Sequence, residues 1–203
     1  MRFIGDIHGN LLMYNGIIAN CDESVQVGDF GVGFLSAYGM ECANEWHRDG
    51  RHKFIRGNHD DPELCKTMPG YIEDGFFDAE RSIMYIGGAW SIDWAYRTPG
   101  YSWWADEELS IPELARMHEL MMHYKPRIVV THDAPESVSY RFFINGTHKK
   151  FHQTRTGGAL EGMFQRHQPD VWLFGHWHES RDEVINGTRF LCLGIDEYID
   201  LEV

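Results

Sequence analysis

The sequence predicts an α/β fold in which helices cover mixed β-sheets, and three observations lead to this prediction. Apolar runs typical of strands alternate with segments of helical spacing early in the chain. Strand-like pairs crowd the C-terminal end, where Asn186-Gly187 is typical of a type I′ hairpin turn. No internal repeat, low-complexity tract or linker divides the 203 residues. A single domain over residues 1–203 is therefore expected.

The individual elements follow from short apolar runs and from helical spacing. The predicted strands cover residues 3–5, 25–28, 53–56, 83–86, 127–131, 171–174, 183–185, 189–191 and 198–203. The predicted helices cover residues 10–20, 35–50, 110–124 and 157–167. The third helix has the clearest start, because Ser110 is a good N-cap, Pro112 is tolerated in a first turn and Glu113 completes a capping box.

Composition limits the function. The net charge is −13, from 18 basic and 31 acidic residues, which argues against binding to long nucleic acids because these require a basic face. A small phosphorylated substrate, held by metals and a few arginines, remains compatible with this charge. No apolar run approaches the roughly 20 residues of a membrane helix, and no signal peptide is visible. The four cysteines are scattered without a CxxC pair, which favours reduced thiols and a cytoplasmic location.

Side chains of metal-ligand type lie in short clusters just after strand-like runs. The seven are Asp6, His8, Asp29, Asn58, His132, His176 and His178. Each cluster alone is a weak signal, because a Gly-Asp pair is usually a turn and a lone histidine is more often a core residue. Their repeated placement after strands carries the weight, since a sheet would bring the strand ends together. The count fits two metal ions with the carboxylate of Asp29 between them.

The ligand types indicate the metals and the chemistry. Mixed His, Asp and Asn ligation suits Mn, Fe or Zn better than Ca or Mg. Two such ions about 3.5–4 Å apart can bind phosphoryl oxygens and a bridging hydroxide, which is the natural nucleophile for in-line attack on phosphorus. The sequence therefore predicts a dinuclear hydrolase of phosphate esters.

The clusters also resemble those of a known family. The segments concerned are residues 5–10 (GDIHGN), 28–29 (GD), 57–60 (GNHD), His132 and 175–178 (GHWH). As an ordered set they resemble the calcineurin-like metallophosphoesterase superfamily, in the form of a small bacterial or phage-type member. The resemblance implies a four-layer sandwich of two mixed β-sheets flanked by helices, with the dinuclear site at the strand ends. It implies Asp6, His8, Asp29 and His178 as ligands of one ion, and Asp29, Asn58, His132 and His176 as ligands of the other. It also implies that His59 binds no metal but stabilises the transition state or protonates the leaving oxygen.

The chain departs from the protein phosphatase branch of that superfamily in the segment after Asp29. There the Gly-Asp motif continues with a second Asp and an Arg, whereas here Val32 holds the second Asp position. The usual carboxylate partner of the catalytic histidine is therefore missing, and the partner of His59 is left open. Arg56 does match that branch and is expected to contact a phosphate.

Two further segments are candidates for substrate contacts. Residues 87–104 hold four of the seven tryptophans. We expect Trp103 and Trp104 to stack on a nucleobase and Arg97 to hold a second phosphate, whereas Trp90 and Trp94 are more often core residues. The basic segment 141–150 is either a lid or a solvated loop. The favoured function is a phosphodiesterase for a small nucleotide or another small phosphate ester. The alternatives are a phosphomonoesterase acting on phosphoproteins and a non-catalytic scaffold.

Overall fold

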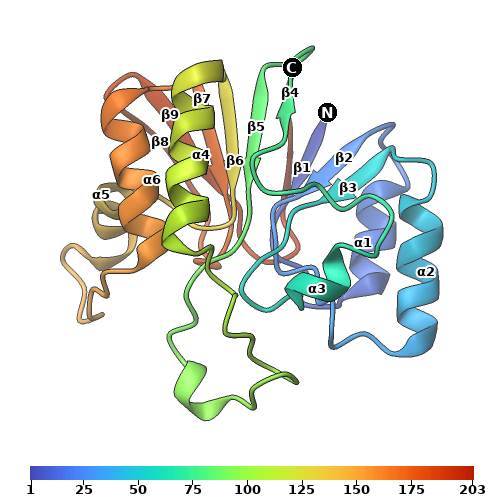
Figure 1. Ribbon diagram of the computed structural model, residues 1–203. Helices are drawn as coiled ribbons and strands as arrows, with labels where there is room; N and C mark the ends of the chain where they lie inside the picture. Colours follow the sequence, from blue (N-terminus) through green and yellow to red (C-terminus); the bar gives the residue numbers. More distant parts are fainter.

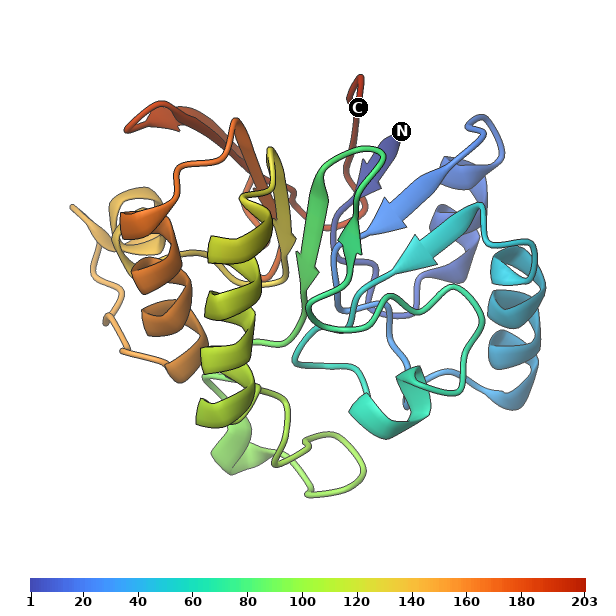
Figure 2. The same cartoon turned by 45° about the horizontal axis from the view of Figure 1, so that its top comes forward.

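The computed structural model describes all 203 residues and has four layers, in which two sheets lie face to face with helices on both outer sides (Figure 1). The first sheet has the strand order β10-β1-β2-β3 and the second β4-β5-β6-β7-β9-β8. The turned view in Figure 2 shows α4 and α6 outside the second sheet and α1 and α2 outside the first. The expected sandwich of two mixed sheets is confirmed.

The strands are short, as expected for buried runs. They are β1 (Arg2–Ile4), β2 (Ser24–Gln26), β3 (His52–Phe54), β4 (Phe77–Asp78), β5 (Ile83–Ile86), β6 (Ile128–Thr131), β7 (Val171–Phe174), β8 (Arg181–Ile185), β9 (Thr188–Cys192) and β10 (Tyr198–Asp200). The central pairs in each sheet are parallel, and the edge strands β4, β8 and β10 are antiparallel to their neighbours. Parallel pairing places several strand ends at one edge.

Four of the six helices begin within two residues of the predicted positions, and the two four-residue helices were not predicted. The helices are α1 (Leu11–Ile18), α2 (Ala37–His47), α3 (Pro62–Cys65), α4 (Ile111–Tyr124), α5 (Glu136–Ser139) and α6 (Arg155–Arg166), with a 3₁₀ turn at Trp94–Tyr96 and a π-helical turn at Tyr140–Ile144. The capping box of Ser110 and Glu113 starts α4 as predicted. None of the helices combines the length and apolar character that crossing a membrane requires.

Alternating side chains of the strands fill two different kinds of core. Phe3, Val130 and Leu173 point between the two sheets, and their neighbours on the strands point toward the helices. Thus Ile4 packs with the α1 and α2 layer, and Trp172 packs with the α4 and α6 layer. Burial on both faces explains why these strands are continuous apolar runs instead of alternating ones.

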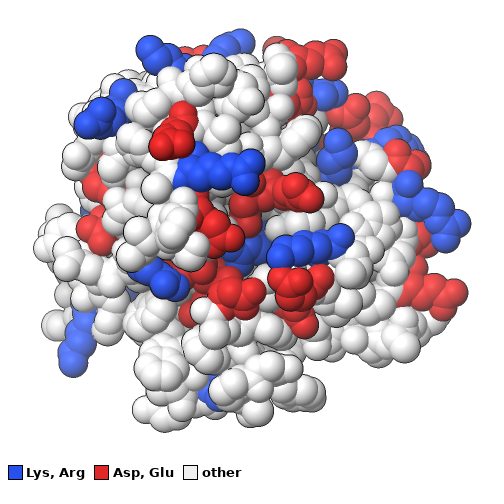
Figure 3. Space-filling model, in the orientation of Figure 1, with Lys and Arg blue, Asp and Glu red and all other residues white.

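The basic segment 141–150 divides into two parts. Phe142, Phe143 and Ile144 are buried in the core beside α6, whereas residues 145–150 are exposed. On the face shown in Figure 3, Lys and Arg side chains alternate with Asp and Glu side chains. This mixture agrees with an acidic chain whose charges are paired locally.

Candidate metal centre

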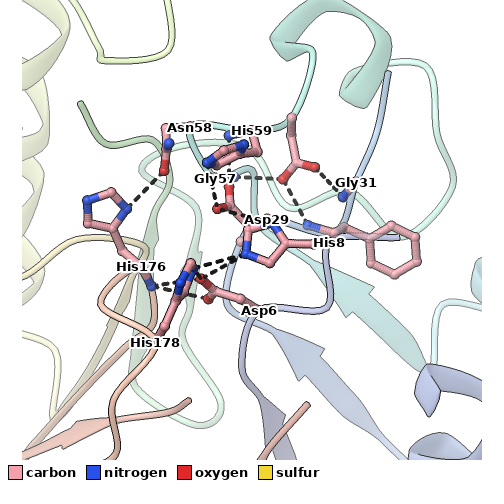
Figure 4. A network of polar contacts seen from close by, with 12 residues as sticks. Asp6, His8, Asp29, Gly31, Gly57, Asn58, His59, His176 and His178 are labelled. Carbon is pink, nitrogen blue, oxygen red and sulfur yellow. Dashed lines mark hydrogen bonds and ion pairs between the residues drawn. The ribbon is translucent and has the colours of Figure 1, made fainter. Parts of the chain in front are cut away.

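The seven predicted ligands come together at one edge of the two sheets, and Figure 4 labels all of them except His132. They lie in the loops that follow β1, β2, β3, β6 and β7. Because these strands run parallel within their sheets, their C-terminal ends meet there. The sequence signal of a polar cluster after each strand therefore becomes a single site in three dimensions.

One half of the cluster surrounds Asp6, whose side chain is fully buried. Nε2 of His178 lies 3.1 Å from Asp6 Oδ2, and Nε2 of His8 lies 3.8 Å from the same oxygen. The two imidazole nitrogens are 3.0 Å apart. Candidate donor atoms of Asp6, His8, Asp29 and His178 all fall within 4.8 Å of one another. This spacing suits a single small cation.

The other half surrounds the amide oxygen of Asn58. Nε2 of His132 lies 3.1 Å from Asn58 Oδ1, and Nδ1 of His176 lies 2.9 Å from it. Asp29 joins the halves, because its Oδ1 lies 3.3 Å from His132 Nε2 and its Oδ2 lies 3.8 Å from His8 Nδ1. Oδ2 of Asp29 is buried and has no hydrogen-bond partner. A cation would supply the missing partner of this oxygen, so the residues present fit a metal centre.

The backbone at the cluster is strained in a way that favours a functional role. His8, Asp29, His176 and His178 all have positive φ angles, between 43° and 66°. Such a conformation costs an L-residue on the order of 1–3 kcal/mol, and strained residues of this kind gather at functional sites.

Glycines precede the ligands because the backbones approach these side chains very closely. A Cβ at Gly57 would lie 2.0 Å from Asp29 Oδ1, and one at Gly175 would lie 2.2 Å from Asp6 Oδ1. Both distances are far shorter than any van der Waals contact. The Gly-Asn and Gly-His pairs of the sequence therefore have a steric cause.

Two groups outside the predicted set hold the ligands in place. His132 Nδ1 donates to the carbonyl of Val27 at 2.9 Å, which leaves Nε2 free to act as a donor to a metal. Gln26, fully buried in β2, donates to Gly5 O at 3.1 Å and accepts from Gly28 N at 3.1 Å, so it ties together the loops of Asp6 and Asp29. Sequence reasoning missed Gln26, although a lone amide within an apolar strand was an available signal.

Charges within the cluster compensate for one another. Burial by itself raises the pKa of Asp29, but the neighbouring imidazole of His132 outweighs this and holds the pKa of that carboxyl below its usual range. Burial lowers the pKa of His132, but Asp29 raises it by more, to about 10. Burial, together with the charge of His132, lowers the pKa of His176 to about 3. The imidazole of His132 and the carboxylate of Asp29 thus stabilise each other's charged forms.

His59 lies beside the ligands and has an unexpected partner. Its Nδ1 and Nε2 lie 2.6 and 3.0 Å from the two Nη atoms of Arg97. Asp93 holds that guanidinium by two bonds of 2.7 and 2.8 Å. Burial lowers the pKa of His59, Asp29 opposes this, and the charge of Arg97 adds to the lowering. The sequence did not indicate a partner for the imidazole of His59. In the structure that partner is Arg97, which is itself paired with Asp93.

Asp60 holds the loop after Asp29 by backbone hydrogen bonds. It is fully buried and accepts from the backbone N–H groups of Gly31 and Gly57, at 2.7 and 2.8 Å, and from that of Val32 at 2.9 Å. Val32 itself is buried in the core under α1 and α2. The loop is thus held by Asp60 from the opposite side, and sequence reasoning gave this residue no role.

A cavity of about 520 Å³ opens over the cluster. Candidate ligands and His59 line one side of it. The other side is lined by Trp90, Ile92, Asp93, Arg97, Lys149, Lys150, Phe151 and His152, among others. The rings of Trp90 and His152 are 5.1 Å apart. The lining of the cavity therefore combines the candidate metal ligands with aromatic and basic side chains.

Three of the four predicted substrate residues lie away from this cavity. Arg56 is buried, with its guanidinium bonded to Asp74 at 2.9 Å and to two backbone carbonyls. Trp104 is buried against Phe34, and Trp103 lies against Trp94 with 5.8 Å between ring centroids. These placements correct the expectation of a phosphate contact at Arg56 and of stacking surfaces at Trp103 and Trp104.

Among the residues of segment 87–104 that line the cavity, Arg97 is the basic one and Trp90 the aromatic one. Arg97 lines the cavity, as expected. Trp90, which was expected to be a core residue, lines it too and is partly exposed. The 3₁₀ turn Trp94–Tyr96 lies between Trp90 and the later pair Trp103 and Trp104, which do not line the cavity. Sequence spacing alone did not reveal that turn.

Two sheets in a four-layer sandwich, with an Asp, His and Asn cluster at the strand ends, define a metallophosphoesterase-like protein. The model of the calcineurin-like phosphoesterase family matches residues 2–180, and the chain belongs to this family. The family is a class of metal-dependent phosphoesterases. No curated protein matches the chain in sequence.

Solved structures confirm the fold at low sequence identity. TT1561 of Thermus thermophilus is 13% identical, with a TM-score of 0.58 over 96% of this chain and 89% of that chain. A putative 5′-nucleotidase from Staphylococcus aureus, solved with α-ketoglutarate, is 15% identical, with a TM-score of 0.60 over 96% of this chain. The match covers 48% of the nucleotidase, so this chain spans about half of that protein. GAP50, the anchor in the inner membrane complex of Plasmodium, is 11% identical, with a TM-score of 0.53 over 96% of this chain and 71% of that one.

Proposed function

We propose that the chain hydrolyses a small phosphodiester, such as a nucleotide, with the help of two transition-metal ions. The observation that carries the proposal is Oδ2 of Asp29, a buried carboxylate oxygen without a partner between two groups of imidazole ligands. When bound, Mn, Fe or Zn ions would supply Lewis-acid stabilisation of the phosphoryl oxygens and activation of water. The chain's own residues hold and orient the substrate.

The two halves of the cluster support an assignment of ligands to ions. Asp6, His8, Asp29 and His178 would hold one ion, and Asp29, Asn58, His132 and His176 would hold the other. Asp29 belongs to both sets because each of its oxygens faces a different half. The rule that carboxylate, amide and imidazole donors together suit Mn, Fe or Zn supports these metals.

His59 and Arg97 supply the protein groups beside the phosphate. His59 is 22% exposed at its side chain and lines the cavity next to Asp29, so it reaches both the site and a bound ester. Its imidazole would protonate the leaving oxygen, or donate a hydrogen bond to a phosphoryl oxygen. Arg97 is anchored by Asp93 and adds a fixed positive charge at the same place.

The shape of the cavity supports a small substrate with a flat group. A volume of about 520 Å³ lies within the range of pockets that hold small molecules such as a nucleotide. The ring of Trp90 offers a stacking surface, which is worth about 1–3 kcal/mol per base and corresponds to roughly 5- to 150-fold in affinity. One neighbour in fold carries the description putative 5′-nucleotidase, which is in keeping with this substrate class.

The test compares three substrates and the metal content of one preparation. Bis-(4-nitrophenyl) phosphate should be hydrolysed faster than 4-nitrophenyl phosphate or a phosphopeptide, and elemental analysis should find two transition-metal ions per chain. A faster reaction with the phosphopeptide would favour the protein phosphatase alternative. Two bound metals without hydrolysis of any ester would favour a binding role.

A pair of tryptophan variants tests the stacking surface. Trp90→Ala should lower kcat/KM for a nucleotide diester by roughly 5- to 150-fold and leave bis-(4-nitrophenyl) phosphate much less affected. Trp103→Ala is the matched control, because this ring lies outside the cavity, against Trp94. Equal losses on both substrates in Trp90→Ala would contradict the role of this ring in stacking.

A further inference from the structure

A chain of buried polar side chains runs from Asn58 through Ser91, which both line the cavity, to Glu107, which does not. Asn58 Nδ2 donates to Ser91 Oγ at 2.9 Å, and Ser91 Oγ donates to Glu107 Oε2 at 2.6 Å. The backbone N–H of Ser91 donates to Glu107 Oε1 at 2.9 Å. All three residues are at most 3% exposed, so water does not compete for these bonds.

The chain has a fixed direction because each group has a limited choice of roles. An ionised carboxylate only accepts hydrogen bonds, so Glu107 takes the single hydroxyl proton of Ser91. Ser91 Oγ then has only lone pairs left for Asn58. It therefore requires the NH₂ end of the Asn58 amide, and the amide oxygen must point the other way, toward His132 and His176.

We propose that Glu107, acting through Ser91, is a positioning residue that fixes which end of the Asn58 amide faces the metal centre. The inference rests on the proposed function, since it concerns how a metal ligand is presented. Without a fixed direction, the amide could turn its NH₂ group to the cation and bind nothing. The carboxylate of Glu107 thus acts on the metal centre through two hydrogen bonds and does not contact the candidate ligands other than through Ser91.

The backbone that carries Glu107 is tied to the loop that carries Asn58. Arg56, two residues before Asn58, donates to the carbonyls of Asp106 and Glu107 at 3.1 and 2.9 Å. Its Nε also donates to Asp74 at 2.9 Å. The buried Arg56 therefore holds the backbone at Glu107 at a fixed position relative to the loop that carries Asn58.

The first experiment titrates Mn²⁺ into metal-free protein by calorimetry. In Glu107→Gln the backbone N–H of Ser91 keeps the new amide oxygen in place, so the NH₂ group faces Ser91 Oγ and donates to it. The hydroxyl proton is then free to point at Asn58, and the amide loses its direction. The variant should still bind one Mn²⁺ per chain normally and bind the second about 10- to 100-fold more weakly, the usual scale for an outer partner of a ligand.

Glu108→Gln is the matched control. Glu108 is the next residue and is also buried, but it accepts from the backbone N–H and the hydroxyl of Thr156, at 2.9 and 3.1 Å, and not from the Asn58 chain. The Glu108→Gln variant removes one negative charge from the same segment as Glu107→Gln does. Its two Mn²⁺ affinities should match those of the wild type, and Ser91→Ala should repeat the weak second site of Glu107→Gln.

A double variant distinguishes direction from simple structural support. Asn58→Asp presents a ligand oxygen at either end, but its second oxygen faces the lone pairs of Ser91 Oγ. Adding Glu107→Gln releases the Ser91 hydroxyl proton to that oxygen. Glu107→Gln should therefore strengthen the second Mn²⁺ site in the Asn58→Asp background, although it weakens this site in the wild type.

The outcomes separate this inference from the proposed function. Wild-type protein that binds no Mn²⁺, or only one ion, overturns the dinuclear site itself. Wild-type protein that binds two, together with Glu107→Gln that binds both equally well, overturns the positioning role alone. Weakening of the second site by Glu107→Gln in both backgrounds would also overturn it, because a merely structural role predicts the same sign in each. Melting temperatures of the metal-free variants identify any that fail to fold. If Glu107→Gln fails to fold, the Mn²⁺ affinities of Ser91→Ala test the same positioning role.

Discussion

His47 should make the folded chain sensitive to acid. The imidazole is fully buried, with its ring stacked on Phe54 at 5.3 Å and its Nε2 accepting from the hydroxyl of Tyr14 at 2.8 Å. Its Nδ1 has no partner. Burial, with a smaller contribution from the charge of His52, lowers the pKa of His47 from 6.5 to about 4. The folded state therefore keeps this ring neutral where the unfolded state protonates it.

The sign and size of the effect follow from linkage. Above pH 6.5 both states hold a neutral ring, and His47 adds no pH dependence. As the pH falls from 6.5 toward 4, only the unfolded state takes up the proton, so the free energy of unfolding decreases. Each pH unit is worth about 1.36 kcal/mol, so between pH 7 and pH 5 the loss attributable to His47 is about 2 kcal/mol.

The assay is urea denaturation of metal-free protein at pH 7 and at pH 5. The decrease in the free energy of unfolding between these values should be about 2 kcal/mol smaller in His47→Leu than in the wild type. Metal is removed because ligand binding to the folded state adds its own stabilisation. Phe54→Leu is the matched control, because it disturbs the same core without removing a titrating group. Its free energy of unfolding should lie below that of the wild type by the same amount at pH 7 and at pH 5. If His47→Leu and the wild type lose the same stability between pH 7 and pH 5, the reasoning fails.

Three further outcomes are expected. Asp29→Asn should lose more metal than Asn58→Ala, because Asp29 faces both halves of the cluster; elemental analysis showing the reverse would remove its bridging role. His59→Asn should keep both metals and lower turnover by roughly 10²- to 10⁴-fold, with a smaller loss on esters of activated leaving groups; equal losses would exclude proton donation to the leaving oxygen. Arg56→Met should lower the free energy of unfolding by about 3–5 kcal/mol in chemical denaturation, because it leaves the half-buried carboxylate of Asp74 without its partner. Unchanged stability together with weaker substrate binding would instead support the earlier expectation that Arg56 contacts a phosphate.

Local sequence signals gave the elements that depend on neighbours in the chain. Helix α4 begins at the capping box of Ser110 and Glu113, which is complete within four residues. The β8–β9 hairpin turns at Asn186 and Gly187, and both have the positive φ that its turn type requires. Short elements were missed, among them β4 and the π-helical turn Tyr140–Ile144, because their formation depends on packing against distant residues.

The sequence by itself determined which residues gather at the candidate site, because each follows a strand and parallel strands end at a common edge. Tertiary structure decided their partners. Arg97 reaches His59 across 38 residues, and Ser91 reaches Asn58 across 33. It also decided that Trp90 faces the cavity while Trp104 is buried. Such contacts are set by how loops of different length fold over the sheet edge. No pattern of spacing encodes that geometry, since the energy of each contact exists only after the sheets have packed.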